Sequence, residues 1–245
     1  MNLCLDIGNT RTKVGLFAGG ELRHTETFAR FGPEEWARLP YNRSIKNCIF
    51  SATGHTDPER IAWLSTQAQL ITFDHHTLLP IKNSYRTPET LGRDRLAAVV
   101  GGSVLFPGAT IFVVDAGTCV TYDLLDSKGT YRGGNIAPGL RMRAEAMQHF
   151  TAKLPFAQPA ITKENPWLGN STQTALALGA ARGLLLEIEG YLAYLEEEFQ
   201  QVRCILTGGD TSFLASHLKS KIFARPNLVL HGLNKILEYN VEKRS

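Results

Sequence analysis

The sequence predicts an α/β protein made of two related halves. Short apolar runs that read as strands alternate with helical segments along the chain. A strand that ends in an Asp-x-Gly turn occurs twice, at Asp6-Ile7-Gly8-Asn9-Thr10 and at Asp115-Ala116-Gly117-Thr118. Because a repeated strand-and-turn pattern indicates repeated structure, we expect an N-terminal half at residues 1–108 and a C-terminal half at residues 109–245. They meet near Pro107-Gly108.

The first half reads as a strand, a hairpin and a strand–helix–strand unit. Ala18-Gly19-Gly20-Glu21 provides the hairpin turn. The helix is expected to begin at Asp57-Pro58, because Asp is a favoured N-cap and Pro a favoured first helical residue. The expected strands are 2–6, 13–17, 22–28, 48–50 and 70–73.

The second half repeats this order and adds an insertion. The insertion includes Gly133 to Gly139 and a long helix, about Thr172 to Gln200, with apolar residues at helical spacing. Gly179 and Gly183 lie near the apolar face of this helix, where they would allow either tight packing within the chain or a subunit interface. The other elements expected are strands 111–115, 120–125, 130–131, 204–206 and 227–230, and a helix at 212–218.

Composition and charge favour a soluble cytosolic protein. The formal charge of +3 is too small to indicate a nucleic-acid or membrane partner, and the N-terminus lacks the pattern of a secretory signal. Residues 96–114 carry no charge over 19 residues, but Gly101-Gly102 and Pro107-Gly108 interrupt them, which favours a buried helix and strand over a membrane span. The four cysteines are not spaced for zinc and are expected to be buried thiols in a reducing compartment, Cys4, Cys48, Cys119 and Cys204.

The two Asp-x-Gly turns are candidates for phosphate binding. Glycine lets backbone N–H groups approach phosphate oxygens, the Thr hydroxyl adds a donor, and the Asp can hold a cation or its water shell. The alternative is a pair of Asx turns that only cap strands, but the repeat favours phosphate binding. Lys13 could reach a phosphoryl oxygen. The predicted phosphate contacts of the first half are Asp6, Ile7, Gly8, Asn9, Thr10, Arg11, Thr12 and Lys13.

With these motifs the chain resembles type III pantothenate kinases, within the acetate kinase, sugar kinase, heat-shock 70 and actin superfamily. The resemblance covers nearly the whole chain and implies an α/β fold of two duplicated ribonuclease-H-like (actin-like ATPase) half-domains, each a mixed sheet flanked by helices. The motifs that carry it occur in the family's order: Asp6 to Thr10 with Lys13, Gly92-Arg93-Asp94-Arg95, Asp115 to Thr118 with Thr121 and Asp123, Gly133 to Gly139, and Thr207-Gly208-Gly209-Asp210.

The resemblance also implies an activity and its residues. The activity is ATP-dependent phosphorylation of pantothenate to 4'-phosphopantothenate, the first step of coenzyme A biosynthesis. Asp94 is implied as the general base, Asp115 as a ligand of a monovalent cation (K⁺ or NH₄⁺), and Thr118 as an ATP contact, with Mg²⁺ arriving on the nucleotide. A homodimer with a shared active site is implied as well. The implied pantothenate contacts are Tyr85, Gly92, Arg93, Asp94, Arg95 and Thr172, the last from the neighbouring subunit.

Simpler readings stay open for the central residues. Asp94 could be the N-cap of a helix at 95–105, alone or besides acting as a base, since Asp is a favoured cap. Arg95 could pair with the pantothenate carboxylate or be a solvated surface charge. The alternatives for the whole chain are another small-molecule kinase or polyphosphate hydrolase of the superfamily, and a nonenzymatic nucleotide-binding regulator. A regulator has no need of a carboxylate such as Asp94, and the sequence has no separate DNA-binding element.

Overall fold

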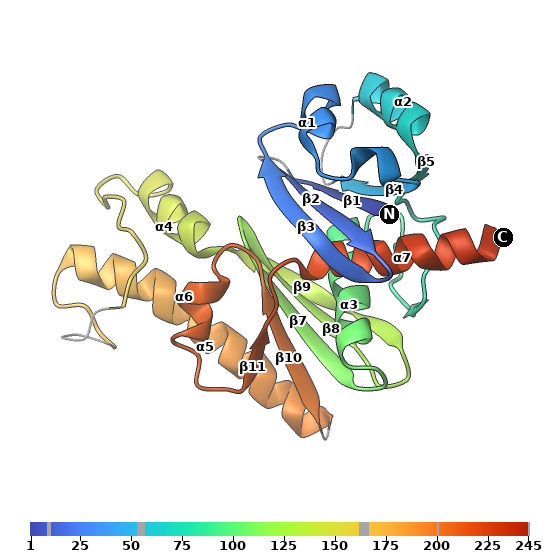
Figure 1. Cartoon of the computed structure of the whole chain (residues 1–245). Coiled ribbons are helices and arrows are strands. Elements are labelled where there is room, and N and C mark those ends of the chain that lie inside the picture. Colours follow the sequence, from blue (N-terminus) through green and yellow to red (C-terminus); the bar gives the residue numbers. More distant parts are fainter. Residues whose placement is uncertain (9–10, 53–56, 162–166, 200, 245) are drawn as a thin grey trace. The chain divides into compact units, whose positions relative to one another are not determined.

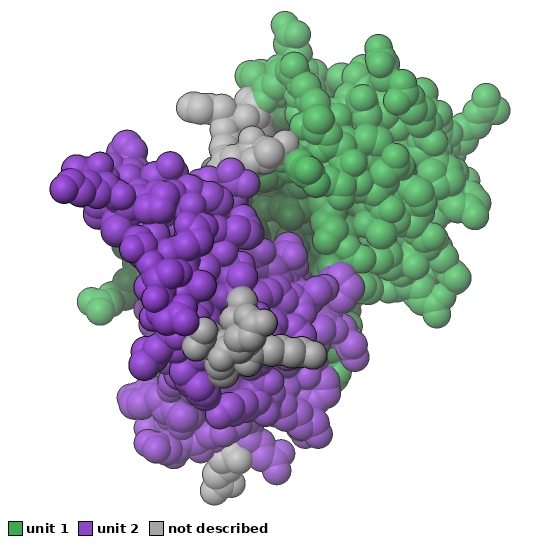
Figure 2. Space-filling view, turned by 90° about the vertical axis from the view of Figure 1, so that its left-hand side faces the viewer, with its two compact units in different colours: residues 1–108, 128–132, 227–245 green, residues 109–127, 133–226 purple. Residues whose placement is uncertain are grey.

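Two mixed sheets, each flanked by helices, build the fold in the computed structural model (Figure 1). The structure describes residues 1–8, 11–52, 57–161, 167–199 and 201–244. They group into two compact units, green and purple in Figure 2: unit 1 holds 1–108, 128–132 and 227–245, and unit 2 holds 109–127 and 133–226. The units and the predicted halves both divide the chain after Gly108. Residues 227–245, however, were predicted in the C-terminal half and group with unit 1.

The sheet of unit 1 is built around its first strand. The strand order is β3-β2-β1-β4-β5, with β1 antiparallel to β2 and parallel to β4. The hairpin turn places Gly19 and Gly20 at positive φ, as a two-residue turn requires. The strands are β1 (Asn2–Ile7), β2 (Thr12–Ala18), β3 (Glu21–Phe28), β4 (Asn47–Ala52) and β5 (Gln69–Thr72).

One face of this sheet packs under short helices. They are α1 (Pro33–Arg38), a 3₁₀ turn (Asn42–Ser44) and α2 (Pro58–Gln67). Helix α2 begins as predicted, because the Asp57 carboxylate accepts a hydrogen bond from the Glu59 N–H at 3.1 Å. Trp36 of α1 and Trp63 of α2 meet edge to face over the buried leucines of β1 and β2.

The rest of unit 1 is a helix pair, α3 (Arg93–Leu105) and α7 (Leu228–Arg244), of which α7 packs on β1, β2 and β4. The predicted strand at 227–230 is wrong, since these residues begin α7, and the strand that follows α6 is instead β11 (Ile222–Ala224). Gly101 and Gly232 make the helix crossing possible: a Cβ on Gly232 would lie 1.7 Å from the Ala97 carbonyl oxygen, and one on Gly101 would lie 2.4 Å from that of Leu228.

The sheet of unit 2 repeats the sheet of unit 1. Its order is β11-β10-β7-β8-β9, so that in each sheet the first strand is antiparallel to the second and parallel to the fourth. A short strand, β6 (Lys82–Asn83), pairs with the start of β9 at residues that group with unit 1. The remaining strands are β7 (Thr110–Ala116), β8 (Cys119–Leu125), β9 (Thr130–Pro138) and β10 (Val202–Thr207). This common order confirms the predicted duplication.

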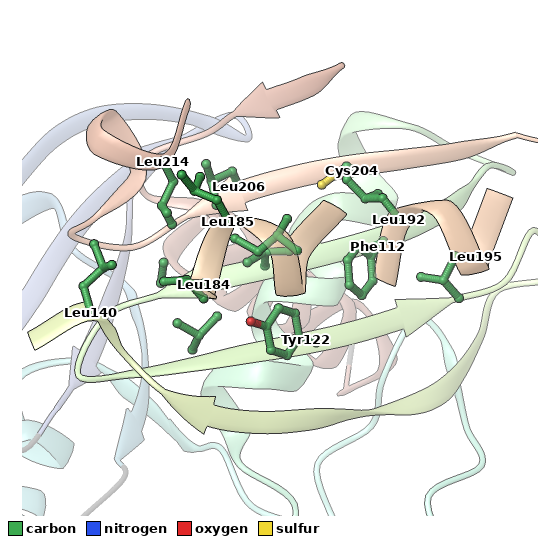
Figure 3. Packing of buried hydrophobic residues seen from close by; sticks show 14 residues of the cluster. Phe112, Tyr122, Leu140, Leu184, Leu185, Leu192, Leu195, Cys204, Leu206 and Leu214 are labelled. Carbon is green, nitrogen blue, oxygen red and sulfur yellow. The ribbon is translucent and has the colours of Figure 1, made fainter. Parts of the chain in front are cut away.

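Helix α5 (Thr172–Glu198) forms the core of unit 2 with this sheet. Figure 3 shows Leu184, Leu185 and Leu192 of α5 among Phe112, Tyr122 and Leu206 of the strands. The positions predicted to share the apolar face of the helix are all buried, namely Leu176, Ala180, Leu184, Ile188, Leu192 and Leu195. Helices α4 (Leu140–His149) and α6 (Thr211–Ala215) complete the unit.

The apolar run at 96–114 forms most of helix α3, a turn with Gly108 at positive φ, and strand β7, as predicted. None of the helices among the described residues is long and apolar enough to span a membrane. Cys4, Cys48 and Cys204 are buried free thiols, but Cys119 is exposed, so the prediction of four buried cysteines is wrong at this position. Cys119 follows directly on the second Asp-x-Gly turn, where β8 has only begun to enter the core.

Candidate active site

The first candidate phosphate turn connects β1 to β2. Asp6 is the second-to-last residue of β1; it faces Lys13 of β2 and Ser51 of β4 in the two ladders. The Gly8 N–H donates to the Arg11 carbonyl oxygen at 3.0 Å, which closes the turn. Of the other predicted contacts, Ile7 ends β1, Arg11 is exposed and Thr12 is buried, while Asn9 and Thr10 lie outside the described residues.

The second candidate phosphate turn has the same place in its own sheet. Asp115 is the second-to-last residue of β7, facing Thr121 of β8 and Thr207 of β10. The Gly117 N–H donates to the Cys119 carbonyl oxygen at 2.9 Å. Thr118 is exposed at the tip, so its hydroxyl is accessible to a ligand. Asp6 and Asp115 therefore occupy equivalent positions, each with a hydroxyl residue opposite it on the parallel strand.

Two distant glycines pack directly on the second turn. Gly139 donates its N–H to the Thr118 carbonyl oxygen at 3.1 Å, and a Cβ there would lie 2.1 Å from the Gly117 carbonyl oxygen. Gly208 has a φ of +94°, and its Cβ would lie 2.3 Å from the Ala116 carbonyl oxygen. Any side chain at either position would displace the turn, which explains why the motifs at 133–139 and 207–210 require glycine.

The Asp115 carboxylate lies against the loop that contains Gly208. Hard cations take oxygen ligands, and a Cβ on Gly208 would lie 2.6 Å from an Asp115 carboxylate oxygen. The backbone at Gly208 therefore packs directly against this carboxylate, and any side chain at 208 would collide with it. Asp210, in the segment between β10 and α6, donates its N–H to the Ala116 carbonyl oxygen at 3.0 Å, and burial raises the pKa of its carboxyl. The described residues contain no group of three or more His, Cys, Asp or Glu that could hold a metal.

The Gly-x-Asp-Arg motif forms the start of α3 in unit 1. The helix begins one residue before Asp94, with Gly92 as its N-cap, so the alternative in which Asp94 caps the helix is wrong. The Asp94 carboxylate instead folds back and accepts a hydrogen bond from the Arg95 N–H at 2.9 Å. A Cβ on Gly92 would lie 2.5 Å from the same carboxylate oxygen, which explains the glycine.

The residues around Asp94 differ in exposure. Arg95 is only 5% exposed, so the reading as a solvated surface charge is wrong. Sequence spacing gave no signal for this burial. The Arg93 guanidinium donates to the carbonyl oxygens of Pro88 and Glu89 at 3.0 and 3.1 Å and thereby fixes the preceding loop. Tyr85 is half-buried, with its ring centroid 6.1 Å from that of Tyr131.

Thr172 is the first residue of α5 in unit 2. Ser171 caps the helix, and Thr174 completes a capping box with it. Thr172 is exposed and takes no part in this box. Its hydroxyl therefore lies at the positive end of a helix of 27 residues.

Comparison with solved structures gives the class. A Campylobacter jejuni protein described as a Baf family transcriptional activator superposes with a TM-score of 0.65 at 21% identity, covering 98% of this chain and 99% of that one. A Sinorhizobium meliloti protein described as a 2-dehydro-3-deoxygalactonokinase gives 0.55 at 12% identity, with coverage of 98% and 99%. These likenesses concern the fold, which is that of the actin-like ATPases and sugar kinases.

Sequence comparison gives the family. The family model described as type III pantothenate kinase matches residues 2–194. A type III pantothenate kinase of Phocaeicola vulgatus is 43% identical, over 98% of this chain and 99% of that protein. One of Cytophaga hutchinsonii is 39% identical, over 98% and 100%. The chain belongs to the type III pantothenate kinase family.

Proposed function

We propose that the chain transfers the γ-phosphoryl group of ATP to the primary hydroxyl of pantothenate, giving 4'-phosphopantothenate and ADP in the first step of coenzyme A biosynthesis. The observation that carries this proposal is the pair of Asp-x-Gly turns at the same register of two equivalent sheets, in a chain that belongs to this family. The residues proposed to carry the reaction include Asp6, Asp94, Asp115 and Thr118.

Each group has one task in this reaction. Phosphoryl transfer depends mainly on positioning and on neutralising charge. The pantothenate hydroxyl oxygen attacks the γ-phosphorus, the bond to the ADP oxygen breaks, and Asp94 takes the hydroxyl proton. Backbone N–H groups of the two turns and Lys13 hold the phosphates. Mg²⁺ bound to the nucleotide would neutralise phosphate charge, with Asp6 facing its water shell.

We propose that the acceptor binds near the start of α3. Tyr85 and the segment Gly92 to Arg95 would contact pantothenate, and Arg95 would pair with its carboxylate. The burial of Arg95 supports this role, because a buried guanidinium gains most from a charged, planar partner.

We propose that Asp115 supports a monovalent cation, K⁺ or NH₄⁺. Replacing K⁺ by Na⁺, or by a bulky organic cation at the same ionic strength, should lower kcat, because the ion beside Asp115 would no longer fit. Asp115→Asn should remove most of this difference between salts. Equal rates of the wild type in all three salts would contradict the cation site.

The activity is tested by measuring ADP release from ATP with pantothenate as acceptor, against a panel of sugars and acetate. Release with pantothenate alone supports the proposal. Preference for another acceptor would indicate a different small-molecule kinase of the superfamily. Nucleotide binding without transfer to any acceptor would indicate a regulator. We place the enzyme in the cytoplasm, consistent with its buried free thiols, and expect no nucleic-acid or membrane partner.

We propose that the working unit is a homodimer in which Thr172 completes the neighbouring site. The exposed side of α5 supports this, since it carries Leu186 at 59% and Tyr194 at 66% exposure. Apart from chain neighbours and the nearby backbone of α5 itself, no described atom lies within 4 Å of a Cβ built on Gly179 or Gly190, and only Arg143 is that close to one on Gly183. Tight packing within the chain therefore gives no reason for these glycines, which leaves the alternative of a subunit interface.

A further inference from the structure

Three polar side chains of unit 2, those of Tyr122, Arg143 and Glu187, are connected by hydrogen bonds near the second candidate phosphate turn. Glu187 of α5 accepts a hydrogen bond from the Tyr122 hydroxyl at 2.7 Å through one carboxylate oxygen. Its other oxygen pairs with the Arg143 guanidinium of α4 at 2.5 Å. Tyr122 is 1% exposed, and the Arg143 and Glu187 side chains are 19% and 27% exposed. Neither the turn motifs nor the family resemblance assigns a task to these three residues.

Arg143 links this group of hydrogen-bonded side chains to the turn. Its Nε donates to the Pro138 carbonyl oxygen at 2.8 Å, while its terminal nitrogen pairs with Glu187. The next residue, Gly139, donates its N–H to the Thr118 carbonyl oxygen. The guanidinium therefore holds the peptide that in turn holds Thr118. The planar fork of arginine suits two acceptors at fixed angles, which the single ammonium of lysine cannot reproduce.

The surroundings show that these contacts are specific. The buried hydroxyl of Tyr122 needs a partner, and burial, followed by its hydrogen bond to Glu187, raises the pKa of this phenol. The guanidinium passes the small residue Gly183 of α5, where an added Cβ would lie 3.9 Å from an Arg143 nitrogen, an ordinary van der Waals distance. An exposed ion pair on the same helix, Arg141 with Glu145 at 2.6 Å, reaches no part of the turn and is expected to contribute little.

We propose that Arg143 and Glu187 are positioning residues, which fix the Pro138–Gly139 peptide and thereby orient the Gly117–Thr118 turn for nucleotide phosphates. The inference rests on the proposed role of this turn in phosphate binding. Glu187 positions Arg143, and Tyr122 orients Glu187. A turn that rotates without this support still forms, but its donors no longer converge on the phosphate oxygens.

The test is the affinity for MgADP, measured by isothermal titration calorimetry without pantothenate. Arg143→Met should weaken binding about tenfold, because losing one hydrogen bond to a charged phosphate oxygen has an effect of about this size or larger. Glu187→Gln should weaken it in the same direction, and the double variant should be no worse than Arg143→Met, because both changes break one connected unit. In turnover, KM for ATP should rise while KM for pantothenate stays within about twofold.

Arg141→Met is the matched control, since it removes an ion pair from the same helix without touching the turn. Arg143→Met binding MgADP as tightly as this control would overturn the inference, as would a strictly additive double variant. If Arg143→Met does not fold, Arg143→Lys decides in the same way: weakened binding supports positioning, and wild-type binding overturns it. Because the readout needs no acceptor, it remains decisive even if the wild type fails to phosphorylate pantothenate.

Discussion

Asp94, the proposed general base, has its side chain held by the adjacent backbone. Its carboxylate is held by the Arg95 N–H, and the missing side chain of Gly92 leaves it room. Asp94→Asn keeps this shape but cannot accept the proton, so kcat should fall about 10²–10⁴-fold, with MgADP affinity and the thermal midpoint near wild type. Turnover of purified Asp94→Asn within a few-fold of the wild type would show that another group is the base.

The charged carboxyl group of Asp210 should lower the stability of the folded protein. Burial raises the pKa of its carboxyl, so the charged form costs stability in the folded state. This cost is present above the folded pKa and disappears as pH falls below the unfolded value. Asp210→Asn should therefore raise Tm at pH 8 more than at pH 4. The measurement is Tm by calorimetry at both pH values; an equal shift at both would contradict it.

From the sequence, the motif around Asp94 could be recognised, but the burial and capping roles of its residues could not be predicted. The spacing of Gly92, Asp94 and Arg95 identified the motif, but not that Gly92 caps the helix or that Arg95 is buried. Both properties depend on how α3 packs against the rest of the fold, and the pattern of a single sequence does not reveal this packing. The exposure of Cys119 has the same origin, since the first residue of a strand can lie on either side of the core boundary.

At the scale of elements, α3 and α7 cross so closely that glycine is needed where they meet. Because a Cβ on Gly232 would lie 1.7 Å from a backbone oxygen, Gly232→Ala must separate the helices. Overpacking typically costs about 1–3 kcal/mol, and we expect at least this loss in the free energy of unfolding, measured in urea. Since α3 carries Asp94, kcat should fall as well. Glu242→Ala, an exposed position of the same helix, is the control; equal stability of the two variants would contradict this reading.

Elements with strong local signals were predicted, and those set by tertiary packing were not. The Gly19-Gly20 hairpin, the Asp57-Pro58 helix start and the long helix α5 all follow local rules. The run at 227–230 was mistaken for a strand, because four apolar or neutral residues fit a strand and a buried helix equally well. Only the packing of α7 against α3 and the first sheet decides between them.

At the scale of the whole molecule, duplication gives each of the two sheets an equivalent Asp-x-Gly turn. Both have the same order and place an aspartate at the second-to-last position of their first strand. The repeat was readable in the sequence because each turn requires Gly at a fixed distance from Asp. The remaining question is how many chains one site needs.

The proposed homodimer makes a prediction that a monomer cannot satisfy. Thr172→Val removes a hydroxyl but leaves the capping box of Ser171 and Thr174 intact, so α5 should still form. Asp94→Asn and Thr172→Val should each be defective alone. Mixed as heterodimers, they should regain activity, because one of the two sites then has both Asp94 and Thr172. The assay is turnover of co-expressed chains, carrying different tags so that the heterodimer can be purified, against each variant alone. Activity no greater than the mean of the two separate variants, in purified heterodimer, would mean that each site is built within one chain.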